Sequence, residues 1–474
     1  MLRASVERDP KKTAVVEVGA DSLTYQQLWD RAARVAGGLR ADGIARGDRV
    51  AIRMPNGLDW VLAFFGAQLA GAAVVPVNTR FTDDEVAYVI DDSECKYVFT
   101  PGDALPDGSP YADEELGGED LGAIFYTSGT TGFPKGAMTS HANFLTNAEN
   151  CVRILNIDRS EAQHIVNLIQ VPLFHVTGCN SQLIPILFVH GRVEVLASPL
   201  DIDGFFRAVN EDGVNHVVSV PAIYYALIHY PRFAELQVDH VNWVSYGGAP
   251  ISEELVREIQ RAFPNARVGN GFGLTECSSL ATFLPHEEAA EHADSVGFAV
   301  PVVDLAIADP DEESGVGELL IRGANVVQGY WKKPEATAET FVDGWLHTGD
   351  VGRIDSDGLL YIVDRMKDMI NRGGENVYSL EVENALVGAP GVGEVAVLGV
   401  PDSMMGEKVG AVIVPADGSE VDVDAVVGYS REHLADFKVP QYVAVREEPL
   451  PRNPGGKVLK SKLRDETDWG APLR

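Results

Sequence analysis

The chain has 474 residues, 45% of them hydrophobic, which is typical of a globular protein with two or three domains. Its 38 Lys and Arg residues against 70 Asp and Glu residues give a formal net charge of −32, which disfavours binding to nucleic acid or to an anionic membrane surface. A phosphate-bearing ligand therefore needs a local basic site.

Cysteine usage and the apolar runs indicate a cytoplasmic protein without an integral membrane segment. The run from Trp60 to Val77 approaches the length of a membrane span, but Gln68, Gly71 and Pro76 interrupt it, which favours a buried helix followed by a buried strand. The N-terminus has no apolar segment typical of a secretory signal. No C-x-x-C pair is present, and we interpret the cysteines as reduced thiols outside any zinc site: Cys95, Cys151, Cys179 and Cys277.

Two helices near the N-terminus are predicted from capping boxes, and a strand-like run follows each. The pairs are Thr24 with Gln27 before residues 49–54, and Thr82 with Glu85 before residues 96–99. Helices that alternate with buried strands are typical of an α/β fold with a mostly parallel sheet. The segment 101–119 is rich in Pro, Gly and acidic residues and predicts a surface loop.

The stretch "IFYTSGTTGFPKGAM", residues 124–138, predicts a strand at 124–126, a loop at 127–136 and a helix from near Ser140. Glycines let backbone N–H groups turn inward, and hydroxyls and a lysine add donors for a polyphosphate. The lysine is followed by Gly136, so the loop is not a Walker A motif. A lone loop of this kind is usually a surface turn, but the pattern S-G-T-T-G-x-x-K-G is too specific to expect from composition. The predicted phosphate-binding residues are Thr127, Ser128, Gly129, Thr130, Thr131 and Lys135.

Two further segments place glycines where a predicted strand ends. In "VSYGGAP", residues 244–250, a glycine pair lets a flat ring approach the backbone, although alone it is typical of a strand-to-helix turn. In "GNGFGLTE", residues 269–276, the glycines lack the G-x-G-x-x-G spacing of a dinucleotide site.

Composition changes again at residues 344–368, which predict a turn, a short strand, an Asp-Gly hairpin, a second strand and a charged junction. Beyond the junction, apolar runs at 395–400 and 410–415 and a helical segment at 381–388 indicate a small α+β domain. We place the domain boundary near Arg365 to Asp368.

The chain resembles the adenylate-forming superfamily, and within it the acyl-CoA synthetases. The segments that carry the resemblance are the loop at 127–136, the two glycine segments, "PLFHVTG" (172–178), "WLHTGD" (345–350), residues 364–383 and "PRNPGGKVLK" (451–460). The resemblance covers nearly the whole chain. It implies an α/β fold with a large N-terminal domain, residues 1–365, of flanked mostly parallel sheets plus a β-barrel-like part, and a small mobile C-terminal α+β domain, residues 366–474.

The resemblance also implies roles for individual residues. His175 lies beside the acyl pocket, Phe272 stacks on adenine, Thr275 contacts the α-phosphate and Glu276 binds magnesium, for which a carboxylate is a suitable hard ligand. The adenine slot is formed by Gly247, Gly248 and Ala249.

Towards the C-terminus, the resemblance assigns the ribose to Asp350 and Arg365, and the hinge to Lys367. Lys457 is the lysine that bridges the substrate carboxylate and the α-phosphate during adenylation. The thiol tunnel is assigned to the loop that contains Gly373 and Gly374.

The expected reaction uses ATP, Mg²⁺ and coenzyme A to convert a carboxylic acid into an acyl adenylate and then a thioester. The predicted pocket segments contain no Arg or Lys for a second carboxylate: 175–179, 219–224, 246–248 and 271–279. We therefore expect a hydrophobic fatty or cyclic monocarboxylic acid. Two alternatives stay open: an acyl-AMP ligase that delivers to a carrier protein or partner ligase, and a nucleotide-binding sensor without catalysis. Either a monomer or a homodimer is compatible with the sequence.

Overall fold

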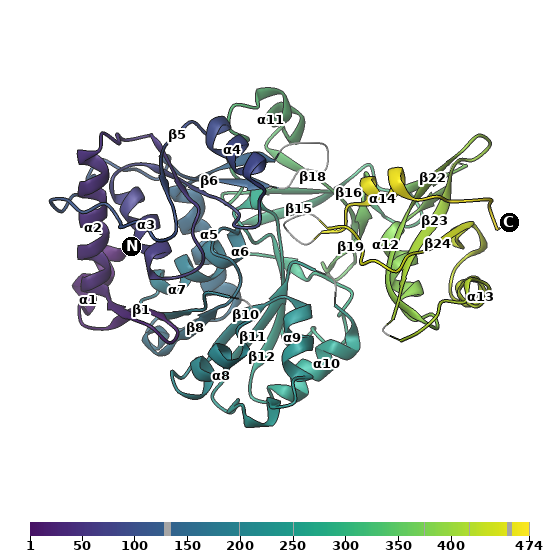
Figure 1. Cartoon of the computed structure of the whole chain (residues 1–474), viewed down its shortest axis with the longest axis horizontal. Helices are drawn as coiled ribbons and strands as arrows, with labels where there is room; N and C mark the ends of the chain where they lie inside the picture. The colour runs from purple at the N-terminus through teal and green to yellow at the C-terminus, as the bar shows by residue number, and fades with distance from the viewer. Residues whose placement is uncertain are drawn as a thin grey trace. The chain divides into compact units, whose positions relative to one another are not determined.

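The computed structural model describes residues 1–127, 134–198, 200–249, 251–373, 375–416, 418–452 and 457–473. The chain divides into two compact units (Figure 1). The first comprises Met1–Ala306, Ile321–His347 and Asp355–Tyr361, and the second comprises Ile307–Leu320, Thr348–Ile354 and Ile362–Arg474. Because the chain passes between the units several times, the single boundary predicted near residue 365 stays a prediction.

The first unit contains a nine-stranded sheet that is parallel at its centre. Its order is β14-β13-β12-β11-β10-β8-β9-β1-β2. The pairs from β12 through β1 are parallel, and the outer pairs are antiparallel. The strands are β1 Thr13–Glu17, β2 Ser22–Thr24, β8 Val166–Ile169, β9 Arg192–Val195, β10 His216–Ser219, β11 Trp243–Gly247, β12 Arg267–Phe272, β13 Thr282–Leu284 and β14 Phe298–Ala299.

A five-stranded sheet in the same unit has the order β5-β3-β4-β6-β7, with parallel pairs except for the β6–β7 hairpin. Its strands are β3 Arg49–Ile52, β4 Ala73–Pro76, β5 Cys95–Phe99, β6 Leu121–Thr127 and β7 Lys135–Ser140. The predicted α/β class with mostly parallel sheets is therefore confirmed.

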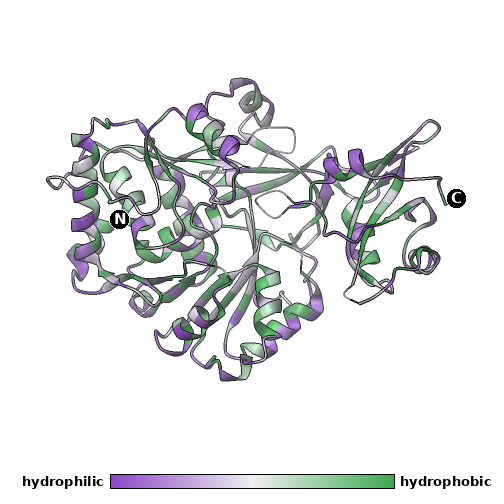
Figure 2. Cartoon of the chain, in the orientation of Figure 1, coloured by the Kyte–Doolittle hydropathy of each residue, from purple (hydrophilic) through white to green (hydrophobic). Residues whose placement is uncertain are grey.

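Helices of the first unit cover these sheets with their apolar faces. Val256 and Ile259 of α10 share one buried core with Val244 and Val268 of the strands beside them (Figure 1). Figure 2 shows hydrophilic and hydrophobic residues alternating along α2, whose buried positions include Leu28 and the other apolar residues of its inner face. The helices are α1 Leu2–Arg8, α2 Tyr25–Ala41, α3 Leu58–Leu69, α4 Asp83–Asp92, α5 His141–Ile154, α6 Val176–Gly178, α7 Ile184–Phe188, α8 Ile202–Asn210, α9 Pro221–Ile228, α10 Glu253–Ala262 and α11 Pro334–Thr340.

A second five-stranded sheet has the order β15-β16-β18-β17, and β19 also pairs with β18. Its strands are β15 Val303–Ala308, β16 Gly317–Gly323, β17 Phe341–Val342, β18 Trp345–Ile354 and β19 Leu360–Arg365. Four of them, β15, β16, β18 and β19, contribute residues to both units.

The second unit also has a five-stranded sheet, of order β21-β20-β23-β22 with β24 beside β23. Two long strands, β22 and β23, form its central hairpin. Its elements are β20 Ile370–Arg372, β21 Glu375–Val377, α12 Ser379–Leu386, β22 Val392–Asp402, β23 Gly406–Pro415, α13 Val423–His433, β24 Tyr442–Val445 and α14 Lys460–Glu466. This is the small α+β fold expected beyond the junction.

Local signals in the sequence are confirmed where they were strongest. Both predicted capping boxes form, at Thr24 and at Thr82, each with side-chain and backbone bonds in both directions. The apolar run at 60–77 becomes buried α3 followed by buried β4. No helix in the described ranges is long and apolar enough to cross a membrane.

Candidate active site

The phosphate loop connects two antiparallel strands, which corrects one sequence prediction. Residues 127–136 were expected to lead directly towards a helix, but Lys135–Ser140 forms strand β7, which pairs with β6. Thr127 lies opposite Lys135, with its hydroxyl oxygen 3.4 Å from the Lys135 carbonyl oxygen. Helix α5 starts after β7, at a capping box on Ser140. The predicted Ser128, Gly129, Thr130 and Thr131 lie outside the described residues.

Lys135 and Glu276 meet at one aromatic side chain, that of Tyr330. The Tyr330 hydroxyl donates a hydrogen bond of 2.7 Å to Oε1 of Glu276. The ammonium nitrogen of Lys135 lies 4.9 Å from the centroid of the same ring. The residue expected to bind phosphate and the residue expected to bind metal are therefore neighbours.

Backbone pairing fixes this arrangement. Ala137 of β7 forms an antiparallel bridge with Tyr330. The Trp331 N–H donates to the Gly136 carbonyl at 2.8 Å, and the Met138 N–H donates to the Gly329 carbonyl at 3.0 Å. The segment 329–331 thus pairs with β7 along its free edge. This pairing places Tyr330 beside Lys135, at the end of the phosphate loop.

The predicted adenine slot lies at the ends of two adjacent parallel strands. Gly247 of β11 is in register with Gly271 of β12, and a Cβ atom on Gly247 would lie 2.2 Å from the Gly271 carbonyl oxygen. Gly248 has φ +76, and among the described residues only Cγ1 of Val220, at 4.0 Å, lies near the position that a Cβ atom would take. Gly248 and Ala249 are exposed. This open backbone surface is where a flat ring can approach.

Phe272, Thr275 and Glu276 follow closely on the neighbouring strand. Phe272 ends β12, and Thr275 and Glu276 belong to a single 3-10 turn, Thr275–Cys277. The turn is tight, because a Cβ atom on Gly273 would lie 1.6 Å from the Ser279 carbonyl oxygen. The strand pairing therefore brings the three residues to the same edge as the adenine slot.

His175 occupies the N-cap of the short helix α6 and is exposed. Its ring lies against that of Phe174, with centroids 4.8 Å apart. An exposed histidine on a buried aromatic neighbour can face a ligand, which agrees with the expected location at the edge of an acyl pocket. Its contact with substrate stays a prediction.

In the second unit, the two predicted ribose residues pair directly. Nε of Arg365 lies 3.0 Å from Oδ1 of Asp350. The Asp350 side chain is almost fully buried, while that of Arg365 is about one-third exposed, at 37%. The Asp350 backbone N–H donates to the Thr348 hydroxyl at 3.0 Å.

The predicted hinge residue, Lys367, lies in a turn directly after β19. The N–H groups of Asp368 and Met369 both donate to the Arg365 carbonyl, at 2.9 and 3.0 Å. Lys367 is exposed; partial desolvation of its ammonium group and the positive charges of Arg365 and Lys460 lower its pKa below the ordinary value, against the opposing charge of Asp368. The role of this turn as a hinge stays a prediction.

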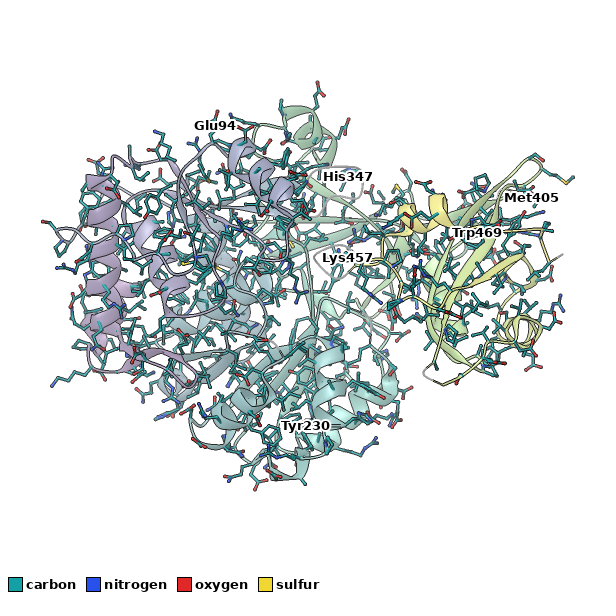
Figure 3. All side chains as sticks on the ribbon, in the orientation of Figure 1. Glu94, Tyr230, His347, Met405, Lys457 and Trp469 are labelled. Carbon is teal, nitrogen blue, oxygen red and sulfur yellow. The ribbon has the colours of Figure 1, made fainter. Side chains whose placement is uncertain are left out.

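Gly373 lies at the tip of the β20–β21 hairpin with φ +65. Its N–H donates to the Met405 carbonyl at 2.7 Å, and a Cβ atom there would lie 2.4 Å from Cε of Met405, which Figure 3 labels. A side chain at Gly373 would therefore displace the end of the Met405 side chain and would lie in the left-handed region of φ. The second predicted tunnel residue, Gly374, lies outside the described residues.

Lys457, also labelled in Figure 3, is exposed on the segment that leads into α14. The neighbouring Val458 forms an antiparallel bridge with Arg452, and the Leu459 N–H donates to the Pro451 carbonyl at 2.8 Å. At the start of α14, Nζ of Lys460 contacts Oε1 of Glu383 at 2.7 Å. These contacts hold the residues that follow Lys457.

The structure thus brings predicted residues together in three groups: Lys135 with Glu276, the adenine slot with Phe272, and Asp350 with Arg365. Sequence reasoning missed Tyr330, which connects the first pair. The only local signal is the aromatic pair in "GYW", residues 329–331, and nothing nearby in the sequence identifies its partners.

Family models match most of the chain. The model described as AMP-binding enzyme matches residues 2–116 and 101–331, and the AMP-binding enzyme C-terminal domain matches residues 381–457. Long-chain-fatty-acid–CoA ligase FadD13 of Mycobacterium tuberculosis is 38% identical over 508 residues, with 100% of this chain and 99% of that relative covered. Feruloyl-CoA synthase of an Amycolatopsis species is 38% identical over 480 residues, with 96% of each covered.

A solved structure agrees with the whole fold. O-succinylbenzoate coenzyme A synthetase (MenE) of Bacillus subtilis, in complex with ATP and magnesium ion, superposes with a TM-score of 0.86 at 28% identity, covering 98% of this chain and 99% of that one. The expected large N-terminal and small C-terminal domains are confirmed by this likeness. The chain belongs to the AMP-binding enzyme family.

Proposed function

We propose that the chain activates a hydrophobic monocarboxylic acid with ATP and Mg²⁺ and transfers the acyl group to coenzyme A, at a site built from the residues described above. The enzyme is an AMP-forming acid–CoA ligase. The observation that carries the assignment of the site is the convergence of Lys135 and Glu276 on Tyr330, which places a cation for phosphate oxygens beside a carboxylate for a metal.

The first step makes the carboxylate reactive. An oxygen of the substrate carboxylate attacks the α-phosphorus of ATP, and the bond to pyrophosphate breaks, which leaves an acyl adenylate. Such a step depends mainly on positioning and on stabilisation of the charge that spreads over the phosphate oxygens. The Thr127–Lys135 hairpin loop holds the β- and γ-phosphates, and Gly247–Ala249 with Phe272 hold the adenine.

Glu276 fits a magnesium ion that also binds phosphate. Its Oε1 accepts the bond from Tyr330, and within the described ranges no hydrogen bond or ion pair occupies Oε2. The ion, when bound, neutralises phosphate charge. One protein carboxylate is enough for this role, because Mg²⁺ usually keeps waters and substrate phosphates as its other ligands.

Lys457 supports the same step from the second unit. Its ammonium group bridges the substrate carboxylate and the α-phosphate, which aligns the attack and stabilises the developing charge. The exposed position of Lys457 on an anchored segment supports this role, because the side chain can reach a ligand while its backbone is held.

In the second step the thiol of coenzyme A attacks the acyl carbon of the adenylate, and AMP leaves. We propose that rotation about Lys367 removes Lys457 and presents the Gly373 loop to the thiol. One site then performs two reactions in turn. The position of Gly373 at the tip of the β20–β21 hairpin supports a loop that can be presented to a ligand.

A hydrophobic acid is favoured over a dicarboxylate or an amino acid. The predicted pocket segments 175–179, 219–224, 246–248 and 271–279 contain no Arg or Lys to pair a second carboxylate. Relatives named for long-chain fatty acids and for ferulate, one aliphatic and one aromatic, support the same class. We therefore propose a fatty or cyclic monocarboxylic acid as substrate and the cytoplasm as location.

Mass spectrometry of products tests the proposal. The protein is incubated with ATP, Mg²⁺ and a panel of fatty, aromatic and polycyclic acids, with and without coenzyme A. Acyl-CoA from one acid class, with AMP and pyrophosphate, is the expected result. Acyl adenylate that never becomes a thioester would instead identify a ligase that serves a carrier protein or partner. Absence of acid-dependent pyrophosphate release would identify a non-catalytic nucleotide sensor.

A further inference from the structure

We propose that Tyr330 is a positioning residue that orients the Glu276 carboxylate for magnesium and, with the same ring, restrains Lys135 for the phosphates. The inference rests on the proposed function, because it assumes that Glu276 and Lys135 act on MgATP. It adds a residue that connects the two.

The hydroxyl of Tyr330 is a protected donor to Glu276. Tyr330 is only 7% exposed, and the hydrogen bond to Oε1 of Glu276 is 2.7 Å long. The hydroxyl therefore fixes one carboxylate oxygen of Glu276, and no hydrogen bond or ion pair within the described residues holds the other.

The ring of the same residue faces the phosphate loop. Nζ of Lys135 lies 4.9 Å from the ring centroid, a distance at which a cation is attracted to an aromatic face. This attraction holds the ammonium group near Glu276 without consuming it in an ion pair. Since no ion pair to Glu276 occurs anywhere in the described part of the chain, both charges stay available to a ligand that carries metal and phosphate together.

Tyr330 itself is held from several sides. Its N–H donates to the Thr337 hydroxyl oxygen at 3.0 Å, and its backbone bridges Ala137. Its ring packs edge-on against Phe341, with centroids 5.7 Å apart at 66°. These contacts restrict the ring and the hydroxyl to one direction, as a positioning group requires.

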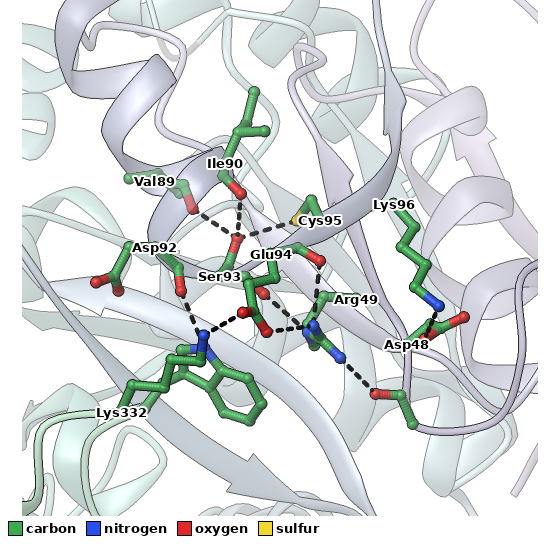
Figure 4. Close-up of polar contacts among 12 residues, drawn as sticks. Asp48, Arg49, Val89, Ile90, Asp92, Ser93, Glu94, Cys95, Lys96 and Lys332 are labelled. Atoms are coloured by element: carbon green, nitrogen blue, oxygen red, sulfur yellow. Dashed lines mark hydrogen bonds and ion pairs between the residues drawn. The ribbon is translucent and has the colours of Figure 1, made fainter.

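The residues that follow Tyr330 are anchored to the end of helix α4. Nε1 of Trp331 donates to the Asp92 carbonyl at 3.1 Å, and the Arg49 guanidinium lies 5.0 Å from the Trp331 ring centroid. Figure 4 shows Lys332 beside Glu94, with which it forms an ion pair, and Arg49 bound to the same carboxylate at 3.0 Å. These contacts hold the segment that carries Tyr330 against α4 and β3. Because they involve protein groups alone, Tyr330 can orient Glu276 before a ligand binds.

A second tyrosine–carboxylate pair in the same unit, Tyr126 with Asp92, differs from the Tyr330–Glu276 pair in the partners of its carboxylate. The Tyr126 hydroxyl donates to Oδ2 of Asp92, also at 2.7 Å. The other oxygen of Asp92, however, is paired with Nζ of Lys333 at 2.7 Å. Asp92 is thus neutralised by Lys333, whereas Glu276 is hydrogen-bonded and has no ion pair among the residues that the structure describes. That difference points to a metal for Glu276 and makes Tyr126→Phe a matched control.

The test is the Mg²⁺ dependence of acid-dependent pyrophosphate release in the full-length wild type, Tyr330→Phe and Tyr126→Phe. Loss of a residue that orients a metal ligand typically costs 10–100-fold in metal affinity or activity. We expect the Mg²⁺ concentration for half-maximal release to rise about 10–100-fold in Tyr330→Phe and to stay unchanged in Tyr126→Phe. Thioester formation from supplied acyl adenylate, which does not need the metal at Glu276, should be unaffected in both.

Two outcomes overturn the inference while leaving the proposed function intact: an unchanged Mg²⁺ dependence in Tyr330→Phe, or an equal shift in Tyr126→Phe. Loss of pyrophosphate release from the wild type itself for every acid would overturn the proposed function and the inference with it. If Tyr330→Phe lowers the melting temperature more than Tyr126→Phe, the comparison is repeated in a Glu276→Gln background. There Tyr330→Phe should cause no further loss of adenylation, and an additional equal loss would contradict a role through Glu276.

Discussion

Arg365 and Asp350, which belong to motifs separated in the sequence, form an ion pair of 3.0 Å between Nε and Oδ1 in the second unit. Asp350 is buried, with 2% exposure, and Arg365 is an ion-pair partner of this buried carboxylate. Because the same two side chains hold each other and are proposed to hold the ribose, removing one of them should affect both the stability of the protein and its binding of ATP.

We expect Arg365→Ala to lower the free energy of unfolding by about 1–3 kcal/mol, because a buried carboxylate loses this ion pair. The KM for ATP should rise as well. Urea denaturation and steady-state kinetics measure the two effects. Arg446→Ala removes an arginine whose partner, Glu448, is exposed, and should change neither. An unchanged KM for ATP in Arg365→Ala would remove this pair from the ribose site.

Lys457→Ala should abolish adenylation, with a loss of about 10²–10³-fold or more, because a donor to the transition-state charge is missing. Thioester formation from supplied acyl adenylate should be largely retained. The control is Lys462→Ala, which removes an exposed lysine of the following helix. Pyrophosphate release and thioester formation are measured separately. Adenylation at the wild-type rate in Lys457→Ala would refute the assignment.

Lys367→Pro should have the converse effect, since proline fixes φ and removes the backbone N–H at the expected hinge. The first half-reaction should be retained and the second lost. Lys367→Ala keeps backbone freedom and should retain both half-reactions. Equal loss of both steps in Lys367→Pro would argue against a hinge at this residue.

Gly248→Ala should weaken ATP binding at the adenine slot. Its φ of +76 places any side chain in the left-handed region, at a cost of about 1–2 kcal/mol, and the new methyl group faces the exposed slot. Gly213→Ala is the matched control, because Gly213 has φ +74 and open space at its Cβ. Both variants should lose similar stability, but only Gly248→Ala should raise the KM for ATP. A similar KM in the two variants would place adenine elsewhere.

A buried carboxyl away from the site should make stability depend on pH. Burial outweighs the nearby Arg192 and raises the pKa of Glu194 to about 8, from its ordinary 4.5. Between these two values the folded state keeps a proton that the unfolded state has lost, so this group makes the protein less stable as the pH rises.

Glu194→Gln removes that dependence. The melting temperature of Glu194→Gln minus that of the wild type should therefore increase steadily from pH 5 to pH 8. The size of this difference at pH 5 does not matter for the test. Glu211→Gln, an exposed residue that follows α8, should run parallel to wild type. A constant difference between Glu194→Gln and wild type across this range would show that Glu194 is ionised in the folded state.

Local signals determined how much of the fold was predictable. Capping boxes and apolar runs fixed α2, α3 and α4, because the residues that define them lie within a few positions of one another. Strand β7 was not predicted, since "KGAMTS" is rich in small and polar residues and is extended only through its pairing with β6 and with residues 329–331. In β7, pairing with distant segments of the chain therefore outweighed the low strand propensity of its residues.

The same distinction applies to the site. Motif residues such as Lys135, Glu276 and Lys457 could be proposed because each lies in a recognisable pattern of neighbours. Tyr330 could not, because its hydrogen-bond partner Glu276 is 54 residues away and only the folded chain brings them together. The ion pair between Asp350 and Arg365 was likewise implied only as a shared ligand, not as a contact.

The most direct test of the central claim follows one oxygen atom. A substrate acid labelled with ¹⁸O in its carboxylate is converted by the full-length protein with ATP, Mg²⁺ and coenzyme A, and the products are weighed by mass spectrometry. Because the carboxylate oxygen attacks the α-phosphorus and stays with phosphorus when the thiol displaces the adenylate, AMP should carry one ¹⁸O atom. Unlabelled AMP, or label in inorganic phosphate, would contradict activation through an acyl adenylate.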